Sequence, residues 1–310
     1  MKAIMYHYVR EFSDSHPNFR YLDIENFSKQ LDFFEKEYGF MEKKDWDDFV
    51  NRKVEDINSF NGKIILTFDD AMKCHYEYVY PELEKRGLWG IFYVNSSPYK
   101  LNKILDVHRI HLLCGAFLGQ DLYKTLLEVI EDKMVSSHMK EYFMNKIYIS
   151  QNNDEGVSDF KSVLNYYMDD KFREYIIDRI ADKFNYTFHN NDFYVSPEEL
   201  SIMSKSGHVI GSHSVNHPVM SKLSKSNQTE EIQQSFGFLN EQNILTHKTF
   251  CHPYGGFHSF NNDTIDILRN EKVEYSFNVE SRDIDQNDLI ENPHCLPRYD
   301  CNEFMHGKTS

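Results

Sequence analysis

The chain has 310 residues, of which 40% are hydrophobic and 15% aromatic, and its formal net charge is −15. This length and apolar content exclude a disordered protein and suit one large barrel domain with an insertion. The acidic balance excludes a broad nucleic-acid-binding surface, although a local basic pocket would still bind an anionic substrate. No run approaches about 18 apolar residues, so no membrane span is predicted.

The N-terminal residues and the cysteines indicate the compartment. Residues 1–8 contain no long apolar segment and no small-residue cleavage site, so no signal peptide is predicted. The five cysteines, an odd number without a Cys-x-x-Cys pair, indicate reduced thiols and not a disulfide framework. We therefore expect a cytoplasmic protein.

The first predicted elements alternate between strands and helices. Residues 3–6 form an apolar run that predicts a buried strand ending at His7. Residues 24–38 carry apolar side chains at three- and four-residue steps, which predicts an amphipathic helix that Gly39 ends. A further strand, helix and strand are predicted at residues 64–68, 72–86 and 88–94, with the helix interrupted or started near Pro81 and ended at Gly87. Strand, helix and strand at this spacing are typical of a parallel sheet.

Two adjacent carboxylates, Asp69 and Asp70, follow the apolar run Ile64–Phe68 directly. A continuous apolar run is typical of a strand buried on both faces. Such a strand delivers the residues after it to the rim of the core, where substrates can reach them. An Asp-rich turn is the alternative interpretation, because Asp is common in turns.

Residues 101–192 interrupt the alternation of strands and helices. They contain only helical patterns, so we predict a helical insertion between the barrel strands. This insertion is either a lid that shapes the substrate site or a packing surface through which a homo-oligomer forms. Asp106, His108, Arg109 and His111 open it, and they either reach the active site or form a solvated polar turn.

Barrel elements resume after residue 192. Ser196, Pro197 and Glu199 predict a capped helix that ends at Gly207. The later predicted elements are a strand over 208–212, a helix over 228–242, a strand over 247–251, a helix from Asp263, a weak strand over 274–279, an acidic loop to Asp288, a last strand over 294–298 and a loose tail at 303–310.

His213 and His217 stand four residues apart, directly after the predicted strand over 208–212. Two such histidines can share one face of a helix or tight turn. With a carboxylate they make the three-ligand set of a catalytic metal that keeps one position open. Asp70 is the carboxylate that we expect to complete the set. Zn²⁺ suits these ligands best, and Fe²⁺, Co²⁺ or Ni²⁺ also fit.

The Thr-Phe-Asp-Asp motif ending at Asp70 and the His-Ser-x-x-His motif of His213 and His217 resemble the polysaccharide deacetylase family, which is also known as the NodB homology or carbohydrate esterase 4 family. The resemblance implies an α/β fold, a distorted (β/α)7-type barrel, that hydrolyses N-acetyl groups on amino sugars. The expected domains are a barrel formed by residues 1–100 and 193–302, the insertion at 101–192 and the tail at 303–310.

The resemblance also implies roles for single residues. Asp69 would be the general base, and the backbone N–H of Tyr254, in a Pro-Tyr-Gly segment, would hold the oxyanion. Where many members carry an Arg that buttresses the catalytic Asp, this chain has Cys251. The sequence therefore leaves the support of Asp69 open.

The general acid is predicted at His7. Most members of the family place this residue in a late Leu-x-His motif, which we do not find in this chain. In the branch of poly-N-acetylglucosamine deacetylases the motifs are permuted, and the His of an N-terminal Tyr-His takes over. Tyr6-His7 matches that pattern, and His294 is the alternative.

The predicted function is the metal-dependent removal of an N-acetyl or N-formyl group from an amino sugar. With no signal peptide predicted, we expect an intracellular substrate that is nucleotide-linked, lipid-linked or a glycan precursor. The alternatives are another C–N amide hydrolase of the same fold and an inactive protein that binds sugar. The missing Arg and late His favour the inactive protein, whereas Asp69 beside a complete ligand set favours an enzyme.

Overall fold

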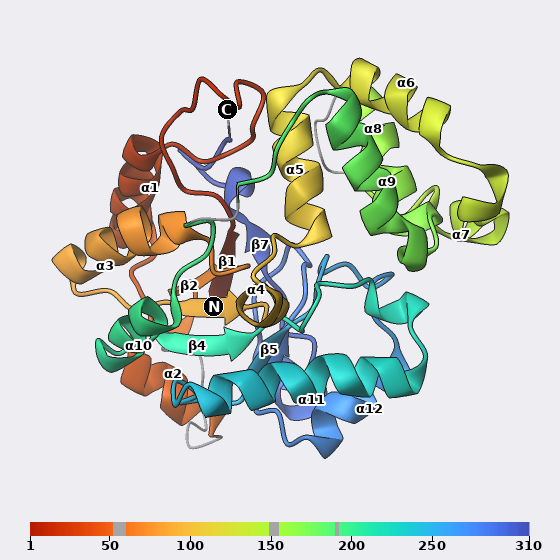
Figure 1. Cartoon of the computed structure of the whole chain (residues 1–310). Coiled ribbons are helices and arrows are strands. Elements are labelled where there is room, and N and C mark those ends of the chain that lie inside the picture. Colours follow the sequence, from red (N-terminus) through yellow and green to blue (C-terminus); the bar gives the residue numbers. More distant parts are fainter. Residues whose placement is uncertain (52–59, 149–154, 190–191, 310) are drawn as a thin grey trace. The chain divides into compact units, whose positions relative to one another are not determined.

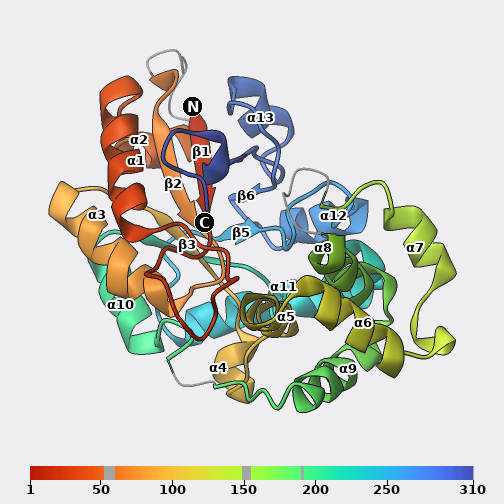
Figure 2. The ribbon, with the colours of Figure 1, turned by 90° about the horizontal axis from the view of Figure 1, so that it is seen from above.

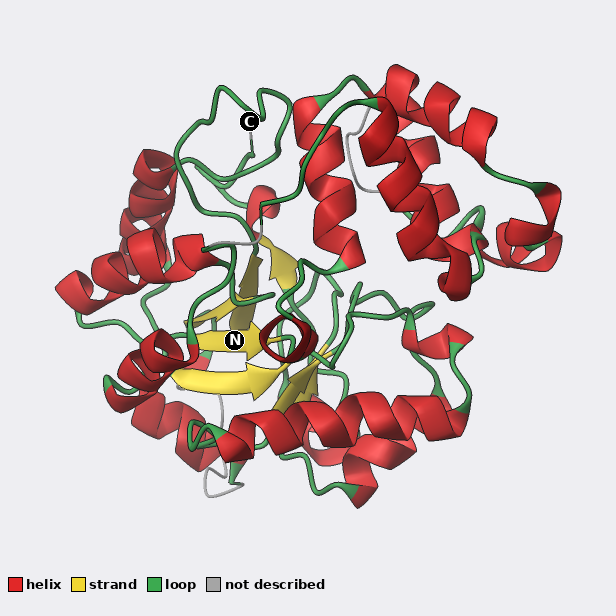
Figure 3. Ribbon diagram, in the orientation of Figure 1, coloured by secondary structure: helices red, strands yellow, loops and turns green. Residues whose placement is uncertain are grey.

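The computed structural model describes residues 1–51, 60–148, 155–189 and 192–309, which form two compact units. The barrel unit comprises Met1–Glu11, Tyr21–Leu101 and Asp192–Ser310, and the helical unit comprises Phe12–Arg20 and Asn102–Asn191. The named strands all belong to the barrel unit, whereas the described part of the helical unit consists of helices and loops (Figure 3).

A seven-stranded parallel sheet forms the centre of the barrel unit, in the order β6-β5-β4-β3-β2-β1-β7. Its strands are β1 Lys2–Tyr6, β2 Ile64–Phe68, β3 Ile91–Val94, β4 Val209–Ser212, β5 Thr249–Cys251, β6 Tyr275–Phe277 and β7 Tyr299–Asp300. Leu296, just before β7, pairs with Phe277 of β6, so this segment bridges the two edges of the curled sheet. The predicted distorted (β/α)7-type barrel is confirmed (Figure 1).

Side chains alternate along the strands and build two apolar layers. One layer, inside the barrel, includes Ala3, Ile65, Ile91, Val209 and Tyr275. The other layer, between the sheet and its helices, includes Ile4, Leu66, Phe92, Ile210 and Phe250. Because both faces of β2 and β3 are buried, these strands have nearly continuous apolar sequences.

Helices cover the outer side of this sheet (Figures 1 and 2). They are α1 Ile24–Glu37, α3 Tyr80–Arg86, α10 Pro197–Lys205, α11 Lys225–Glu241 and α12 Asn262–Asn270. The shorter α2 Lys43–Val50 and α13 Gln286–Glu291 contribute Trp46, Phe49 and Leu289 to the inner layer, and α4 Ser97–Leu101 follows β3. The predicted capping box of α10 is present, since Ser196 and Glu199 each accept a hydrogen bond from the other's backbone N–H. Among the described residues, no helix is both long and apolar enough to cross a membrane.

The boundaries of several elements in the barrel unit differ from the sequence predictions. The predicted helix over 72–86 is a π-helical turn, His75–Val79, followed by α3, so the predicted interruption or start near Pro81 and the end at Gly87 are confirmed. The acidic loop before Asp288 leads into α13, whose start is capped by the Asp285 side chain. The last strand begins at Tyr299 and not at residue 294, because the preceding residues cross the gap between β6 and β7.

The segment predicted as a loose tail is packed on the barrel unit. The Phe304 ring lies 5.2 Å from that of Phe34, measured between centroids. The Gln30 side chain also donates a hydrogen bond to the Met305 carbonyl oxygen. The prediction of a loose tail was wrong at Phe304 and Met305, because α1 presents an apolar face and a buried amide that these two residues contact.

The helical unit contains α5 Asp106–Ala116, α6 Gly119–Val129, α7 Ser137–Phe143, α8 Glu155–Ser162 and α9 Asp170–Lys183. Residues 12–20 cluster with it, whereas the sequence analysis assigned them to the barrel. The buried Arg109 pairs with Asp106 and Asp178 and stacks on Phe188. Arg109 is therefore a structural residue of the helical unit and is not part of a solvated turn.

Candidate active site

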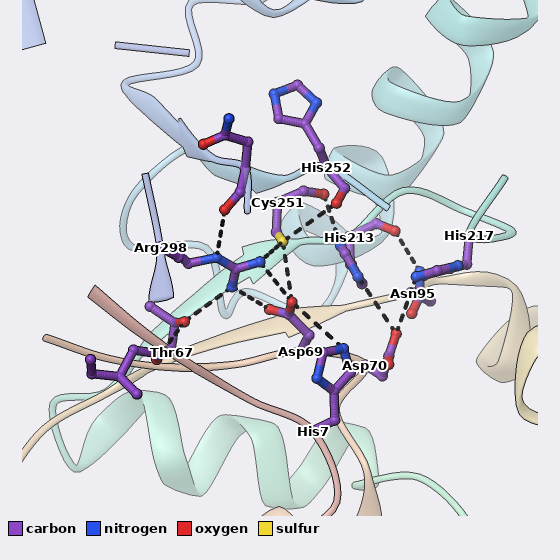
Figure 4. A network of polar contacts seen from close by, with 12 residues as sticks. His7, Thr67, Asp69, Asp70, Asn95, His213, His217, Cys251, His252 and Arg298 are labelled. Carbon is purple, nitrogen blue, oxygen red and sulfur yellow. Dashed lines mark hydrogen bonds and ion pairs between the residues drawn. The ribbon is translucent and has the colours of Figure 1, made fainter. Parts of the chain in front are cut away.

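The candidate residues meet at one rim of the barrel, where the carboxyl ends of its parallel strands lie together. His7 follows β1, Asp69 and Asp70 follow β2, Asn95 follows β3 and His213 follows β4 (Figure 4). These strands are parallel and neighbouring in the sheet, so the residues that follow them lie at the same edge of the core. Residues more than 200 positions apart in the sequence thus become neighbours.

Asp70, His213 and His217 form a compact set of metal-binding side chains. Asp70 Oδ1 lies 3.6 Å from His213 Nε2 and 3.8 Å from His217 Nε2. One ligand atom from each residue falls within 4.8 Å of the others, and all three residues are buried. Ligands about 2 Å from a tetrahedral cation are about 3.3 Å apart, so this donor set fits a divalent metal after small side-chain movements.

His213 presents the ring nitrogen that a metal ligand requires. Its Nδ1 lies 2.8 Å from the Cys251 carbonyl oxygen, to which a protonated Nδ1 donates. That bond leaves the Nε2 lone pair directed towards Asp70. Burial lowers the pKa of His213 against the opposing effect of Asp69 and Asp70, which favours the neutral, metal-binding ring.

A second group of possible metal ligands consists of Asp69, His213 and Cys251. Two of its members, Asp69 and Cys251, are already bonded to the positively charged Arg298. The Arg298 guanidinium donates to Asp69 and, through Nη2, to Cys251 Sγ at 2.9 Å. Burial raises the pKa of the Cys251 thiol well above its ordinary value, and a protonated thiol is a poor metal ligand. The first set is therefore the better candidate for a metal.

Arg298 holds Asp69, and the sequence analysis missed this residue. Its Nη1 and Nη2 donate to the two carboxylate oxygens at 2.8 Å each, a bidentate pair. Burial alone would raise the pKa of Asp69, but Arg298, with smaller effects of His213 and His7, holds it at about 2. The residue that supports Asp69 in place of the arginine missing at Cys251 is therefore Arg298, which directly precedes β7.

Every donor direction of the Arg298 guanidinium is used. Besides Asp69 and Cys251, its Nε donates to the Asn278 carbonyl oxygen at 3.1 Å and its Nη1 to Thr67 Oγ1 at 3.0 Å. The side chain is fully buried. A buried arginine needs such partners. The sequence signal for this role was the position of Arg298 directly after the apolar residues that begin at residue 295.

His7 lies beside Asp69 and remains accessible. Its Nε2 is 4.0 Å from Asp69 Oδ2, and its side chain is 39% exposed. The alternative, His294, is buried, and its backbone oxygen accepts hydrogen bonds from His252 Nε2 and Ser276 Oγ. Burial lowers the pKa of His294 to about 4. The geometry therefore favours His7 as the histidine that faces Asp69, and its role as an acid stays a prediction.

Left-handed backbone conformations cluster at this rim. The φ angles of Asp70, Ser214, His217 and Tyr254 are 76°, 71°, 54° and 63°. Such angles are unfavourable for residues other than glycine and persist where the surroundings hold them. The Tyr254 ring lies 4.7 Å from the His217 ring, so the predicted oxyanion residue is next to the candidate metal ligands.

The polysaccharide deacetylase family model matches residues 160–277, a range that includes His213, His217 and Tyr254. The resemblance to the polysaccharide deacetylase family is confirmed. The match does not extend to Asp69 and Asp70, but the structure brings these two residues to the same rim. No curated protein matches the chain.

Solved polysaccharide deacetylases share the fold over almost the whole chain. The deacetylase PplD of Streptococcus pyogenes has a TM-score of 0.59 and 14% identity, with 97% of this chain and 91% of that chain covered. IcaB of Ammonifex degensii has a TM-score of 0.54 and 18% identity, with 96% of this chain and 90% of that chain covered. A de-N-acetylase of Aggregatibacter actinomycetemcomitans has a TM-score of 0.52 and 13% identity, with 96% of this chain and 93% of that chain covered. At these identities the likeness establishes the deacetylase fold.

Proposed function

We propose that this chain is a metal-dependent hydrolase that removes an N-acetyl or N-formyl group from an amino sugar. The observation that carries the proposal is the pairing of two carboxylates with different surroundings. Asp70 faces His213 and His217, whereas Asp69 faces Arg298 and His7. One carboxylate is thus available as a metal ligand and the other as a base. The resemblance to a de-N-acetylase supports an N-acyl substrate.

Asp70, His213 and His217 are the residues that would hold the metal. When bound there, a divalent cation would polarise the amide carbonyl and acidify water. Zn²⁺ suits the donor set, and Fe²⁺, Co²⁺ or Ni²⁺ are the alternatives.

The remaining roles belong to side chains around that set. Asp69, kept ionised by Arg298, would accept a proton from the attacking water. His7 would donate a proton to the departing amine, which is otherwise a poor leaving group. The backbone N–H of Tyr254 would stabilise the negative charge on the former carbonyl oxygen. The products would be a free amino sugar and acetate or formate.

The proposed substrate class follows from the compartment that the sequence predicts. The odd number of cysteines supports a cytoplasmic protein, and hence a nucleotide-linked, lipid-linked or precursor amino sugar. The inactive sugar-binding alternative rested partly on the missing arginine. That ground is weakened, because Arg298 provides a guanidinium on Asp69.

We expect the purified protein to bind about one equivalent of a divalent metal per chain and to release acetate or formate from N-acylated amino sugars. Elemental analysis measures the metal, and a coupled assay measures the acid from free and nucleotide-linked substrates. Failure to bind metal even after reconstitution would refute the Asp70–His213–His217 site. Bound metal without release would refute free and nucleotide-linked amino sugars as the substrates.

His7→Ala is expected to lower the turnover number about 100-fold or more and to leave the metal content unchanged. Among the ion pairs of the described residues, His7 pairs with Asp69 and with none of the three proposed metal ligands, so its loss should leave the metal bound. The matched control is His294→Ala, at the alternative acid. A large loss with His294→Ala and none with His7→Ala would transfer the acid role to His294.

A further inference from the structure

The loop between the two histidines of the candidate metal site is tied to one carboxylate from a helix. Glu231 lies on α11, and its Oε2 accepts hydrogen bonds from the backbone N–H groups of Val215 and Asn216 at 2.9 Å each. Its Oε1 accepts from Asn216 Nδ2 at 2.6 Å. The Ser214 hydroxyl adds a further hydrogen bond to the same carboxylate. All three residues between His213 and His217 therefore donate to Glu231.

This loop needs an external support. Ser214 and His217 have left-handed φ angles of 71° and 54°, which local preferences disfavour. Ser214 Oγ accepts from the His217 backbone N–H at 3.1 Å, so Ser214 connects the second histidine to Glu231. In this conformation the Ser214 and Val215 carbonyl oxygens accept hydrogen bonds from the backbone N–H groups of Ser96 and Ser97, whereas the backbone N–H groups of Val215 and Asn216 donate to Glu231.

Helix α11 is a firm base for this contact. It packs on the sheet through Ile232 and Phe236 in the outer apolar layer. Ser235, four residues after Glu231 and on the same helix face, bonds to Ser212 at the end of β4. The helix is therefore hydrogen-bonded both to β4, which precedes His213, and to the loop that leads to His217.

We propose that Glu231 is a positioning residue that sets the affinity of the metal site by holding the His213–His217 loop. It acts through the backbone of Val215 and Asn216, and none of its hydrogen bonds among the described residues reaches the side chain of a proposed ligand. Outer contacts of this kind typically change metal affinity by about 10- to 100-fold when they are removed. The inference rests on the proposed function, because it assumes that the two histidines bind a divalent cation.

The test compares Glu231→Ala and Glu231→Gln with Gln228→Ala, a control on the same helix. Gln228 is buried and bonds to Thr264, Asn261 and Leu223, away from the loop. Zn²⁺ and Co²⁺ affinities are measured by competition with a chromogenic chelator. The Co²⁺ absorption spectrum reports ligand geometry, and urea denaturation of the metal-free protein reports stability.

Glu231→Ala is expected to bind both metals about 10- to 100-fold more weakly and to change the Co²⁺ spectrum. Gln228→Ala is expected to lose stability while keeping the wild-type affinity and spectrum. Glu231→Gln keeps the side-chain volume and one oxygen for the backbone N–H groups, so its affinity should lie between those of wild type and Glu231→Ala. If Glu231→Ala does not fold, Glu231→Gln carries the test by binding more weakly than Gln228→Ala.

Two results would overturn the inference alone. One is a Glu231→Ala protein with the wild-type affinity and Co²⁺ spectrum. The other is an equal loss of affinity in Gln228→Ala, which would show a general effect of helix stability. A wild-type protein that binds neither metal would instead refute the proposed metal site, and the inference with it.

Discussion

Arg298→Met is expected to lower the free energy of unfolding by about 3 to 5 kcal/mol and to abolish most activity. The substitution leaves the Asp69 carboxylate buried without the guanidinium that donates to both of its oxygens. Burial then disfavours the ionised form that acts as a base. Urea denaturation of the metal-free protein measures the stability, and acid release from the substrate measures the activity.

A double-mutant cycle isolates the ion pair between Arg298 and Asp69. Arg298→Met combined with Asp69→Asn removes both charges, so the double variant should be more stable than the sum of the two single losses predicts. Arg298→Lys should recover only part of the stability, because one ammonium group cannot reproduce the bidentate pair. Additive losses in the cycle, or a stable Arg298→Met protein, would contradict a dominant role of this pair.

Asp69→Asn is expected to reduce the turnover number by about 10²- to 10⁴-fold while the metal content stays at the wild-type level. An amide cannot accept the proton of the attacking water, whereas the proposed ligands Asp70, His213 and His217 are untouched. The variant also leaves Arg298 without its anion, so it should be less stable. Activity is therefore measured at a temperature at which circular dichroism shows a folded protein.

The neighbouring substitution Asp70→Asn is the matched control, since it makes the same chemical change one residue further on. It should weaken metal binding and remove activity together, because Asp70 faces both histidines. The two variants thus separate a base from a ligand within one motif. An active Asp69→Asn protein, or one that loses its metal as Asp70→Asn does, would refute the division of roles.

Most barrel strands and the residues that follow them could be predicted from the sequence. Apolar runs such as Ile64–Phe68 predict strands buried on both faces, and parallel strands present their carboxyl ends at one rim. For this reason Asp69 and Asp70 could be predicted to lie near His213 and His217 without knowledge of the strand order. The capping box of α10 was also predictable, because a cap depends on residues within one turn.

The side chains that support these residues could not be predicted, because they come from distant segments that meet only in the folded chain. Arg298 reaches Asp69 because the segment before β7 crosses to the edge strand β6, and this crossing depends on sheet curvature and strand register. Glu231 meets the loop after His213 because α11 packs on β4, a contact that no local pattern specifies. Residues 12–20 join the helical unit for the same reason. Local sequence patterns report on burial and turns, whereas these contacts are set by packing between distant segments.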